Sequence, residues 1–348
     1  MWVTSSLATA LTPTAVALGN FDGLHLGHRQ VIQPILQATG RGKIVPPILS
    51  VEDCQVELDN TSLPILKENL ENQAAQGRGH VYPTVATFNP HPREFFSGIS
   101  WKLLTPRSEK VQQLDILGVE QLVLLPFDRE LASLSPQQFV EKILVQQLSV
   151  KQVSVGEDFC FGHQRVGTSG DLKAIASSYG IDVSIVPLQT CQGERISSSI
   201  IRQALEQGDI TQANRRLGRP YTLTGMVVKG QQLGRTIGFP TANLELPPEK
   251  FLPRQGVYSV RVYSPSLGSP ISSQPGVMNI GMRPTVSGTA LRIEIHLLDW
   301  SGDLYGQTLT VSLEQFLRPE QKFASLDNLK AQIQADCAVA RAFFENRK

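Results

Sequence analysis

The sequence is poor in several residue types, and each shortage excludes a class of protein. It has only 4 cysteines in 348 residues, and their separation gives neither a disulfide framework nor metal-ligand spacing. We therefore expect Cys54, Cys160, Cys191 and Cys337 to be reduced thiols in a cytoplasmic protein. No run of about 18 apolar residues is present, so no membrane span is expected. The first residues lack a basic segment and are interrupted by Pro13, so no signal peptide is expected.

The sequence also lacks an excess of charge of either sign. The formal net charge is +1, with 18 basic and 21 acidic residues in 1–218, and 14 and 10 in 219–348. Neither half is basic enough to bind nucleic acid by charge, so small-molecule substrates are expected. The sequence does not decide between a monomer and a homo-oligomer. A chain of 348 residues exceeds one ordinary core, so we expect two domains, at 1–218 and 219–348.

The first half alternates strand and helix patterns, which predicts a Rossmann-like, doubly wound parallel sheet, an α/β fold. The expected strands are 15–18, 81–88, 121–125, 152–155 and 182–186. Helices are expected from about residue 25, at 108–117, from 136, and at 171–179. Residues 39–80 break this pattern and are interpreted as an insertion with a short helix at 63–75.

The second half changes to short alternating segments separated by Gly, Pro and Ser, after a helical linker at 203–218. This pattern predicts an antiparallel β-barrel or a sandwich, and we adopt the barrel. The expected strands are 222–228, 256–263, 276–280, 290–298 and 308–317. A terminal helix is expected over 325–346.

The most informative stretch of the first half is residues 19–28, Gly-Asn-Phe-Asp-Gly-Leu-His-Leu-Gly-His. It lies where a buried strand ends and a helix begins, so unpaired N–H groups and the helix dipole favour an anion there. His25 and His28 are three residues apart on one helix face, which lets both face one phosphate chain. A turn followed by two surface histidines is the alternative interpretation.

Two further runs suit phosphate chemistry. Residues 195–202, Arg-Ile-Ser-Ser-Ser-Ile-Ile-Arg, place hydroxyls and Arg202 at a helix start, although serines there are usually caps. In the second half, residues 230–244 are rich in glycine, which permits close approach of backbone to phosphate; a hairpin loop is the alternative. Thr241 and Asn243 face one side of an extended chain, and their oxygens suit Mg²⁺.

These runs resemble one family, the prokaryotic bifunctional riboflavin kinase/FMN adenylyltransferases (FAD synthetases). Residues 19–28 resemble the His-x-Gly-His signature of the FMN adenylyltransferase branch of nucleotidyltransferases. The serine run resembles Ile-Ser-Ser-Thr-x-x-Arg, with Ser199 replacing threonine, and residues 87–92 resemble Thr-Phe-x-Pro-His-Pro. Gly-Arg-x-x-Gly-Phe-Pro-Thr-Ala-Asn-Leu at 234–244 resembles the riboflavin kinase signature, as do 279–285, 294–299 and 317–327. The resemblance covers nearly the whole chain except 39–80.

The resemblance implies a set of site residues in the first half, with His25 and His28 catalytic. Residues that would bind the ATP used for adenylylation are Gly19, Phe21, Asp22, Gly23, His25, His28, Asp158, Arg195, Ser198, Ser199 and Arg202. Residues that would contact the flavin are Asn89, Pro90, His91, Phe96, Phe139 and Phe161. Core packing explains the three phenylalanines about equally well.

In the second half the resemblance makes Glu294 the catalytic base for the ribityl hydroxyl of riboflavin. Glu294 and His296 share a strand face, for which a surface ion pair is the default explanation. Residues that would bind the ATP of the kinase are Gly230, Gly234, Arg235, Gly238, Pro240, Thr241 and Asn243. Thr241 and Asn243 would hold Mg²⁺, and Glu294 and Arg318 would border the flavin.

The sequence-based hypothesis is therefore that riboflavin is converted to FMN and then to FAD, with ATP in both steps. One alternative is an adenylyl- or cytidylyltransferase for another phosphorylated substrate, with a flavin-sensing barrel. A class I tRNA-synthetase-like protein is disfavoured because no Lys-Met-Ser-Lys-Ser-like loop or basic RNA-binding face is present. A non-catalytic binding protein is least favoured because both halves retain reactive groups.

Overall fold

A computed structural model of the chain describes all residues except 41–78, 231–233, 235–236, 265–272, 286–287 and 347–348. The chain folds into two compact units that divide between Ser198 and Ser199. The helix expected at 63–75, and Cys54, lie outside the described residues. Of the helices that the structure describes, none is both long and apolar enough for a membrane crossing.

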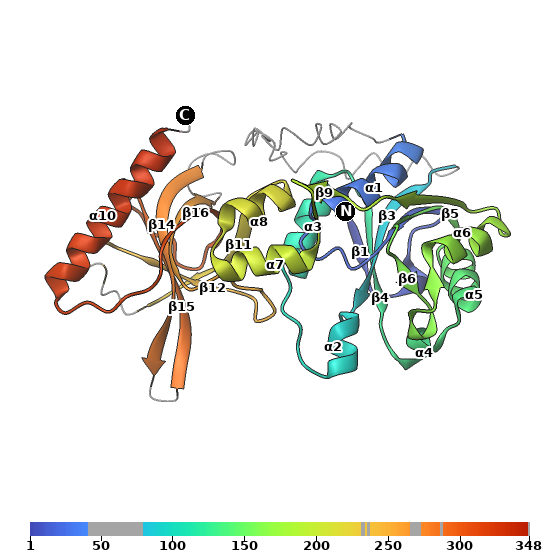
Figure 1. Cartoon of the computed structure of the whole chain (residues 1–348), viewed down its shortest axis with the longest axis horizontal. Coiled ribbons are helices and arrows are strands. Elements are labelled where there is room, and N and C mark those ends of the chain that lie inside the picture. Colours follow the sequence, from blue (N-terminus) through green and yellow to red (C-terminus); the bar gives the residue numbers. More distant parts are fainter. Residues whose placement is uncertain (41–78, 231–233, 235–236, 265–272, 286–287, 347–348) are drawn as a thin grey trace. The chain divides into compact units, whose positions relative to one another are not determined.

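The first unit is built on a six-stranded, fully parallel sheet in the order β1-β4-β3-β2-β5-β8, which confirms the predicted fold (Figure 1). Its strands are β1 (Trp2–Thr4), β2 (Thr14–Leu18), β3 (Tyr82–Asn89), β4 (Gln121–Pro126), β5 (Val150–Gly156) and β8 (Asp182–Val186). The edge strand β1 has only three residues, too few to show an alternating pattern, and was not expected.

Helices cover both faces of this sheet, because successive strand residues point to opposite sides. Val16 and Leu18 of β2 pack in one core with α5 (Pro136–Phe139), the π-helix η3 (Val140–Gln147) and α6 (Ser169–Ser177). Ala15 and Ala17 pack in the other core with α1 (Leu26–Ala38) and α3 (Arg107–Ile116). The carboxyl ends of the central strands, where α/β proteins bind ligands, are thereby held between two rigid layers.

Helix starts follow the capping residues, with one correction. Ser135 and Gln138 form the capping box that their spacing predicts at the start of α5. Helix α6 was expected to start at Asp171, but it starts at Ser169, because Thr168 is the N-cap and Asp171 is the third residue of its capping box. Several short elements were not expected: α2 (Pro92–Ser97), α4 (Arg129–Ser133), η1 (Leu7–Thr9), η4 (His163–Arg165), and the paired strands β6 (Cys160–Phe161) with β7 (Gly167–Thr168) and β9 (Thr190–Cys191) with β10 (Glu194–Arg195).

The second unit is a closed six-stranded antiparallel barrel in the order β11-β12-β15-β14-β13-β16, so the barrel and not the sandwich is correct. Its strands are β11 (Tyr221–Val228), β12 (Ala242–Glu245), β13 (Gly256–Tyr263), β14 (Ser273–Thr285), β15 (Gly288–Leu297) and β16 (Thr308–Arg318). Strand β12 was not expected as a strand, and β14 is longer than expected.

Helices precede and follow the barrel strands in the sequence. The predicted linker forms α7 (Ser198–Gln207) and α8 (Ile210–Leu217), and Asn214 joins α8 to the barrel by bonding the Leu313 carbonyl at 2.8 Å and the Tyr221 amide at 2.7 Å. The terminal helix α10 (Leu326–Glu345) packs Cys337 and Phe344 against barrel residues such as Val257. The helix therefore seals one side of the barrel wall.

Candidate functional sites

The corner after β2 has a backbone that ordinary residues rarely adopt. Phe21 and Leu24 both have φ of 46°, and Gly23 between them has φ of 91°. Left-handed conformations of bulky residues cost roughly 1–3 kcal/mol each and persist only where surrounding structure imposes them. Both side chains are buried in the core beneath α1, which supplies that constraint. The glycine-rich corner is therefore a fixed structure, as expected of a pre-organised anion site.

The two histidines of the corner lie against each other at the start of α1. His25 is the N-cap, its Nδ1 accepts the His28 amide at 3.2 Å, and the rings stack with centroids 3.6 Å apart. Because Nδ1 is an acceptor, the proton of a neutral His25 lies on Nε2. Burial lowers the pKa of His25 to about 4, and burial also lowers the pKa of His28. Both rings are thus neutral at physiological pH.

One serine of the run at 195–202, Ser198, contacts the corner directly. Ser198 donates its hydroxyl to the Asp22 carbonyl at 2.8 Å, and the Asp22 carboxylate accepts the Thr105 amide at 3.2 Å. Asp158 and Arg195 form an ion pair in the same unit, with both side chains about half exposed. Ser199 and Arg202 belong to the second unit, where the Arg202 guanidinium lies 4.6 Å from the ring centre of Phe251.

Sequence reasoning missed one buried cation in this corner, Lys110. Its ammonium group donates to the Asn20 carbonyl at 3.0 Å, and the residue is 7% exposed. Burial lowers the pKa of Lys110 to about 8, partly opposed by the negative charge of Asp22. The sequence places Lys110 in a helix, but only packing shows that this residue turns inward.

The predicted flavin residues of this unit separate into two groups. His91 is the N-cap of α2 and stacks on Trp101 with ring centroids 5.6 Å apart, and Phe96 is 73% exposed beside Phe127. Phe139 and Phe161 are 3% and 4% exposed in the core, which agrees with the packing interpretation. Asn89 ends β3, and Pro90 follows it in the turn before His91. Trp101 and Phe127 were not predicted.

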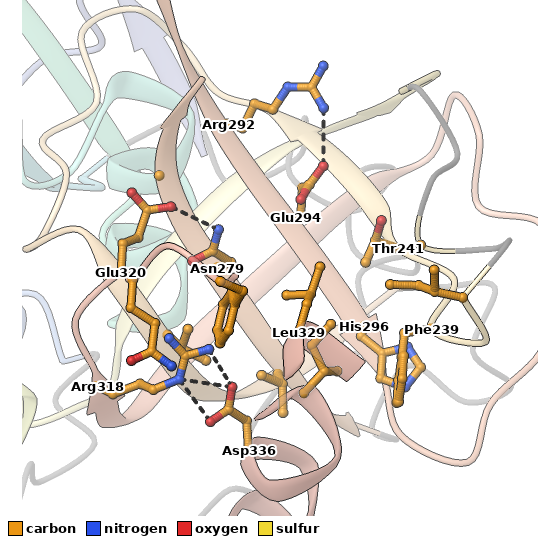
Figure 2. A pocket seen from close by; sticks show the side chains of 18 of the residues that line it. Phe239, Thr241, Asn279, Arg292, Glu294, His296, Arg318, Glu320, Leu329 and Asp336 are labelled. Atoms are coloured by element: carbon orange, nitrogen blue, oxygen red, sulfur yellow. Dashed lines mark hydrogen bonds and ion pairs between the residues drawn. The ribbon is translucent and has the colours of Figure 1, made fainter. Parts of the chain in front are cut away.

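The second unit contains a cavity of about 390 Å³ in the barrel wall, and Glu294 projects into it (Figure 2). Pairing register places Glu294 of β15 beside Asn279 of β14, and both line the cavity, while Asn243 of β12 pairs with Glu294 on its other side. Cross-strand partners on one face lie about 5 Å apart, so this row is a direct consequence of register. Arg292 Nη1 lies 3.3 Å from Glu294 Oε1 and orients the carboxylate.

The glycine-rich run lies beside this row. A methyl group at Gly230 would overlap the Asn243 amide, and one at Gly234 would overlap the Phe239 carbonyl and lie 3.3 Å from the Thr241 hydroxyl, so both positions require glycine. His296 contacts the Pro240 carbonyl through Nδ1 at 2.9 Å, next to Thr241. Gly238 has φ of 89°, a backbone conformation that favours glycine over other residues. Arg235 lies outside the described residues.

The opposite wall of the cavity contains a buried ion pair that joins the barrel to α10. Arg318 donates to both carboxylate oxygens of Asp336, at 3.0 and 3.1 Å from Nε and 2.7 Å from Nη2 (Figure 2). Gln332 adds a bond to Asp336 at 2.9 Å. The predicted flavin residue Arg318 is thus held in place by Asp336, which sequence reasoning missed because the two are 18 positions apart.

No group of three or more His, Cys, Asp or Glu side chains suited to a metal ion occurs among the residues that the structure describes. A hydroxyl and an amide oxygen, as at Thr241 and Asn243, are instead the neutral donors that Mg²⁺ accepts when phosphates supply further ligands. Thr241 lines the cavity, and Asn243 is the cross-strand partner of Glu294, which also lines it. The donor set therefore fits Mg²⁺ bound together with a nucleotide.

Comparisons with known proteins show the family to which the chain belongs. A family model described as FAD synthetase matches residues 7–49 and 66–200, and one described as riboflavin kinase matches 217–344. The bifunctional riboflavin kinase/FMN adenylyltransferase of Escherichia coli K12 is 39% identical to this chain, over 94% of this chain and 92% of the relative. The enzyme of the same name from Pseudomonas fluorescens is 37% identical, over 93% of this chain and 91% of the relative. The crystal structure of a macrolide-efflux protein from Streptococcus pneumoniae gives a TM-score of 0.77 at 29% identity, covering 97% of this chain and 98% of that chain.

Proposed function

Because the chain belongs to the family of bifunctional riboflavin kinase/FMN adenylyltransferases, we propose that its two reactions take place at two separate sites, formed by different parts of the chain. The enzyme phosphorylates riboflavin to FMN and adenylylates FMN to FAD, using ATP in both reactions and releasing pyrophosphate in the second. We assign adenylylation to residues 1–218 and the kinase to 219–348, which the limits of the family models at 200 and 217 support.

For adenylylation, an oxygen of the FMN phosphate attacks the α-phosphorus of ATP and the bond to pyrophosphate breaks. We place this reaction at the corner of residues 19–28, where the N–H groups of α1, His25 and His28 stabilise charge on the transferred phosphorus. Gly19, Phe21, Asp22 and Gly23 form the backbone of this corner. The rigid backbone and neutral rings support this, since fixed donors need no rearrangement as charge develops.

The remaining contacts for adenylylation follow from the resemblance. Ser198 is bonded to the corner, and Ser199 and Arg202 follow it on α7 as further triphosphate ligands. Asp158 and Arg195 are assigned to the nucleotide as a pair. The flavin is assigned to the turn of Asn89, Pro90 and His91 and to the exposed ring of Phe96. Phe139 and Phe161 retain the lower-ranked assignment, because core packing already accounts for them.

For the kinase, the 5′-hydroxyl of riboflavin attacks the γ-phosphorus of ATP, and its proton passes to Glu294 as general base. The position of Glu294 in the cavity, next to Asn243 in register, is the observation that carries this assignment. Thr241 and Asn243 would hold Mg²⁺, which supplies charge neutralisation on the phosphates when bound. Gly230, Gly234, Arg235, Gly238 and Pro240 are assigned to the nucleotide, and Arg318 to the flavin.

A single incubation tests this assignment. Purified full-length protein is incubated with riboflavin and Mg-ATP, and FMN and FAD are separated by chromatography. ATP labelled at the γ-phosphate must label FMN, whereas ATP labelled at the α-phosphate must label only FAD. Tight riboflavin binding without ATP consumption, or formation of FMN alone, would contradict the two-site proposal.

We also propose a cytoplasmic location without a nucleic-acid or membrane partner, and a homo-oligomer stays open. The described cysteines, Cys160, Cys191 and Cys337, are free thiols, which suits a reducing compartment. The near-neutral net charge supports small-molecule substrates.

A further inference from the structure

The ammonium group of Lys110 is buried, and neither of the two proposed reaction mechanisms uses it. It extends from α3 to the Asn20 carbonyl at 3.0 Å, and the Thr87 hydroxyl of β3 donates to the same oxygen at 2.9 Å. Asn20 stands between Gly19 and Phe21, at the turn where the strained corner begins. Two donors from two different elements therefore converge on one carbonyl of the proposed phosphate site.

The charged groups near this carbonyl include a buried carboxylate that works against the N–H groups of the corner. His25 and His28 are neutral, the Asp22 carboxylate is 3% exposed, Arg195 is paired with Asp158, and burial lowers the pKa of Arg29 on α1. Lys110 interacts electrostatically with Asp22 and with His28, and its neighbour Glu109 is also buried. A triphosphate approaching a buried carboxylate without a compensating cation would be repelled in this low-dielectric setting.

We propose that Lys110 is a positioning residue for adenylyl transfer, which holds the Asn20 carbonyl and offsets the charge of Asp22 so that the corner accepts a nucleoside triphosphate. The inference rests on the proposed site at residues 19–28. Lys110 acts through the turn and through its electric field, without contact to the reacting atoms.

The proposal differs from a merely structural role in its dependence on a positive charge at position 110. Burying a lysine ammonium is costly, and a methionine of similar length fills the same space without that cost. In Lys110→Met the Asn20 carbonyl keeps its bond from Thr87, so no backbone group is left without a partner. Because the buried Asp22 carboxylate loses its counter-charge, we expect this variant to lose adenylylation and also to unfold at a lower temperature, whereas Lys110→Arg keeps the charge.

The experiment uses the full-length enzyme with Lys110→Met, Lys110→Arg and a matched control, Lys173→Met, at an exposed lysine of the same unit. We expect Lys110→Met to lower kcat/KM for ATP in FAD formation about 100-fold, the size typical for loss of one pre-organised electrostatic contact. Riboflavin phosphorylation, measured on the same sample, stays at the wild-type rate. Lys110→Arg retains most of the activity and Lys173→Met all of it.

A pH profile gives the second readout. In the wild type, FAD formation decreases as the pH rises through the pKa of Lys110, which is about 8 in the unliganded protein. Lys110→Arg moves this decrease to higher pH, because a guanidinium stays charged. Wild-type kcat/KM in Lys110→Met, or an equal loss in Lys110→Met and Lys110→Arg, would overturn the proposal. His28→Ala, assayed in parallel, separates failure of the Lys110 proposal from failure of the proposed site at residues 19–28. If His28→Ala keeps FAD formation, the assignment of that site is wrong.

Discussion

The two proposed phosphate sites are built in contrasting ways. The first unit uses a local device, one turn between a strand and the next helix, in which strained backbone and neutral histidines present N–H groups. The second unit uses a non-local device, a row of polar side chains from three strands whose order is set by barrel pairing. The comparison teaches that a turn can carry its chemistry in ten consecutive residues, whereas a barrel site depends on strands distant in sequence.

The largest effect is expected where the non-local row loses its acid–base group. Glu294→Gln keeps the shape of the side chain but removes the general base, so kcat for FMN formation falls roughly 1,000-fold. Conversion of supplied FMN to FAD stays unchanged, and this serves as the control within the same molecule. If both rates fell in a folded protein, the two sites would not be separate.

The reciprocal substitution is expected to have a somewhat smaller effect on the local device. His28→Ala removes one donor of the corner, so the rate of FAD formation from FMN falls roughly 100-fold. Riboflavin phosphorylation, followed by chromatography, stays at the wild-type rate. A substantial decrease in kinase activity would show that the corner influences the barrel and would break the comparison.

Lowering the pH should decrease the free energy of unfolding of the first unit more than that of the second. His25 has a pKa of about 4 in the folded protein against 6.5 in its ordinary state, so the unfolded chain binds more protons between these values. The contribution of His25 is fully present above pH 6.5 and is lost as the pH falls toward 4, a change of roughly 3 kcal/mol in the free energy of unfolding. His28 shifts in the same direction, whereas the second unit has one histidine, His296.

Calorimetry of the full chain between pH 7 and pH 4 measures this difference. The transition of the first unit should move to lower temperature more steeply than that of the second. His25→Asn keeps an N-cap acceptor but does not titrate, so it should flatten the response of the first unit. An equal slope for both units would contradict the assignment of acid sensitivity to the buried histidines.

The smallest effect is expected at the far wall of the kinase cavity. Asp336→Asn weakens the hold on Arg318, so the KM for riboflavin should rise about 10-fold, as expected when a charge-assisted hydrogen bond is weakened. Asp299→Asn is the matched control, because Asp299 forms a surface ion pair with Arg341, which lies on α10 like Asp336. If the control had the same effect, stability of α10 rather than the position of Arg318 would explain the result.

The local features were predictable from sequence and the non-local ones were not. The spacing of His25 and His28 fixes their common helix face, and the structure places the rings together. Strand β12 has four residues whose pairing depends on β11 and β15, so its segment gave no strand pattern of its own. Lys110 and Asp336 lie on helices whose inward faces are decided by packing against the sheet and the barrel.

The pairing of Asn243, Glu294 and Asn279 makes the kinase intolerant of single-codon insertions and deletions. One extra residue within β12, β14 or β15 reverses the inside–outside order of every following side chain in that strand. Indel-scanning libraries should therefore lose FMN production throughout these strands, although many of their point variants survive. Length changes are better tolerated in the surface loops of both units, which makes those loops the practical places to graft a reporter peptide.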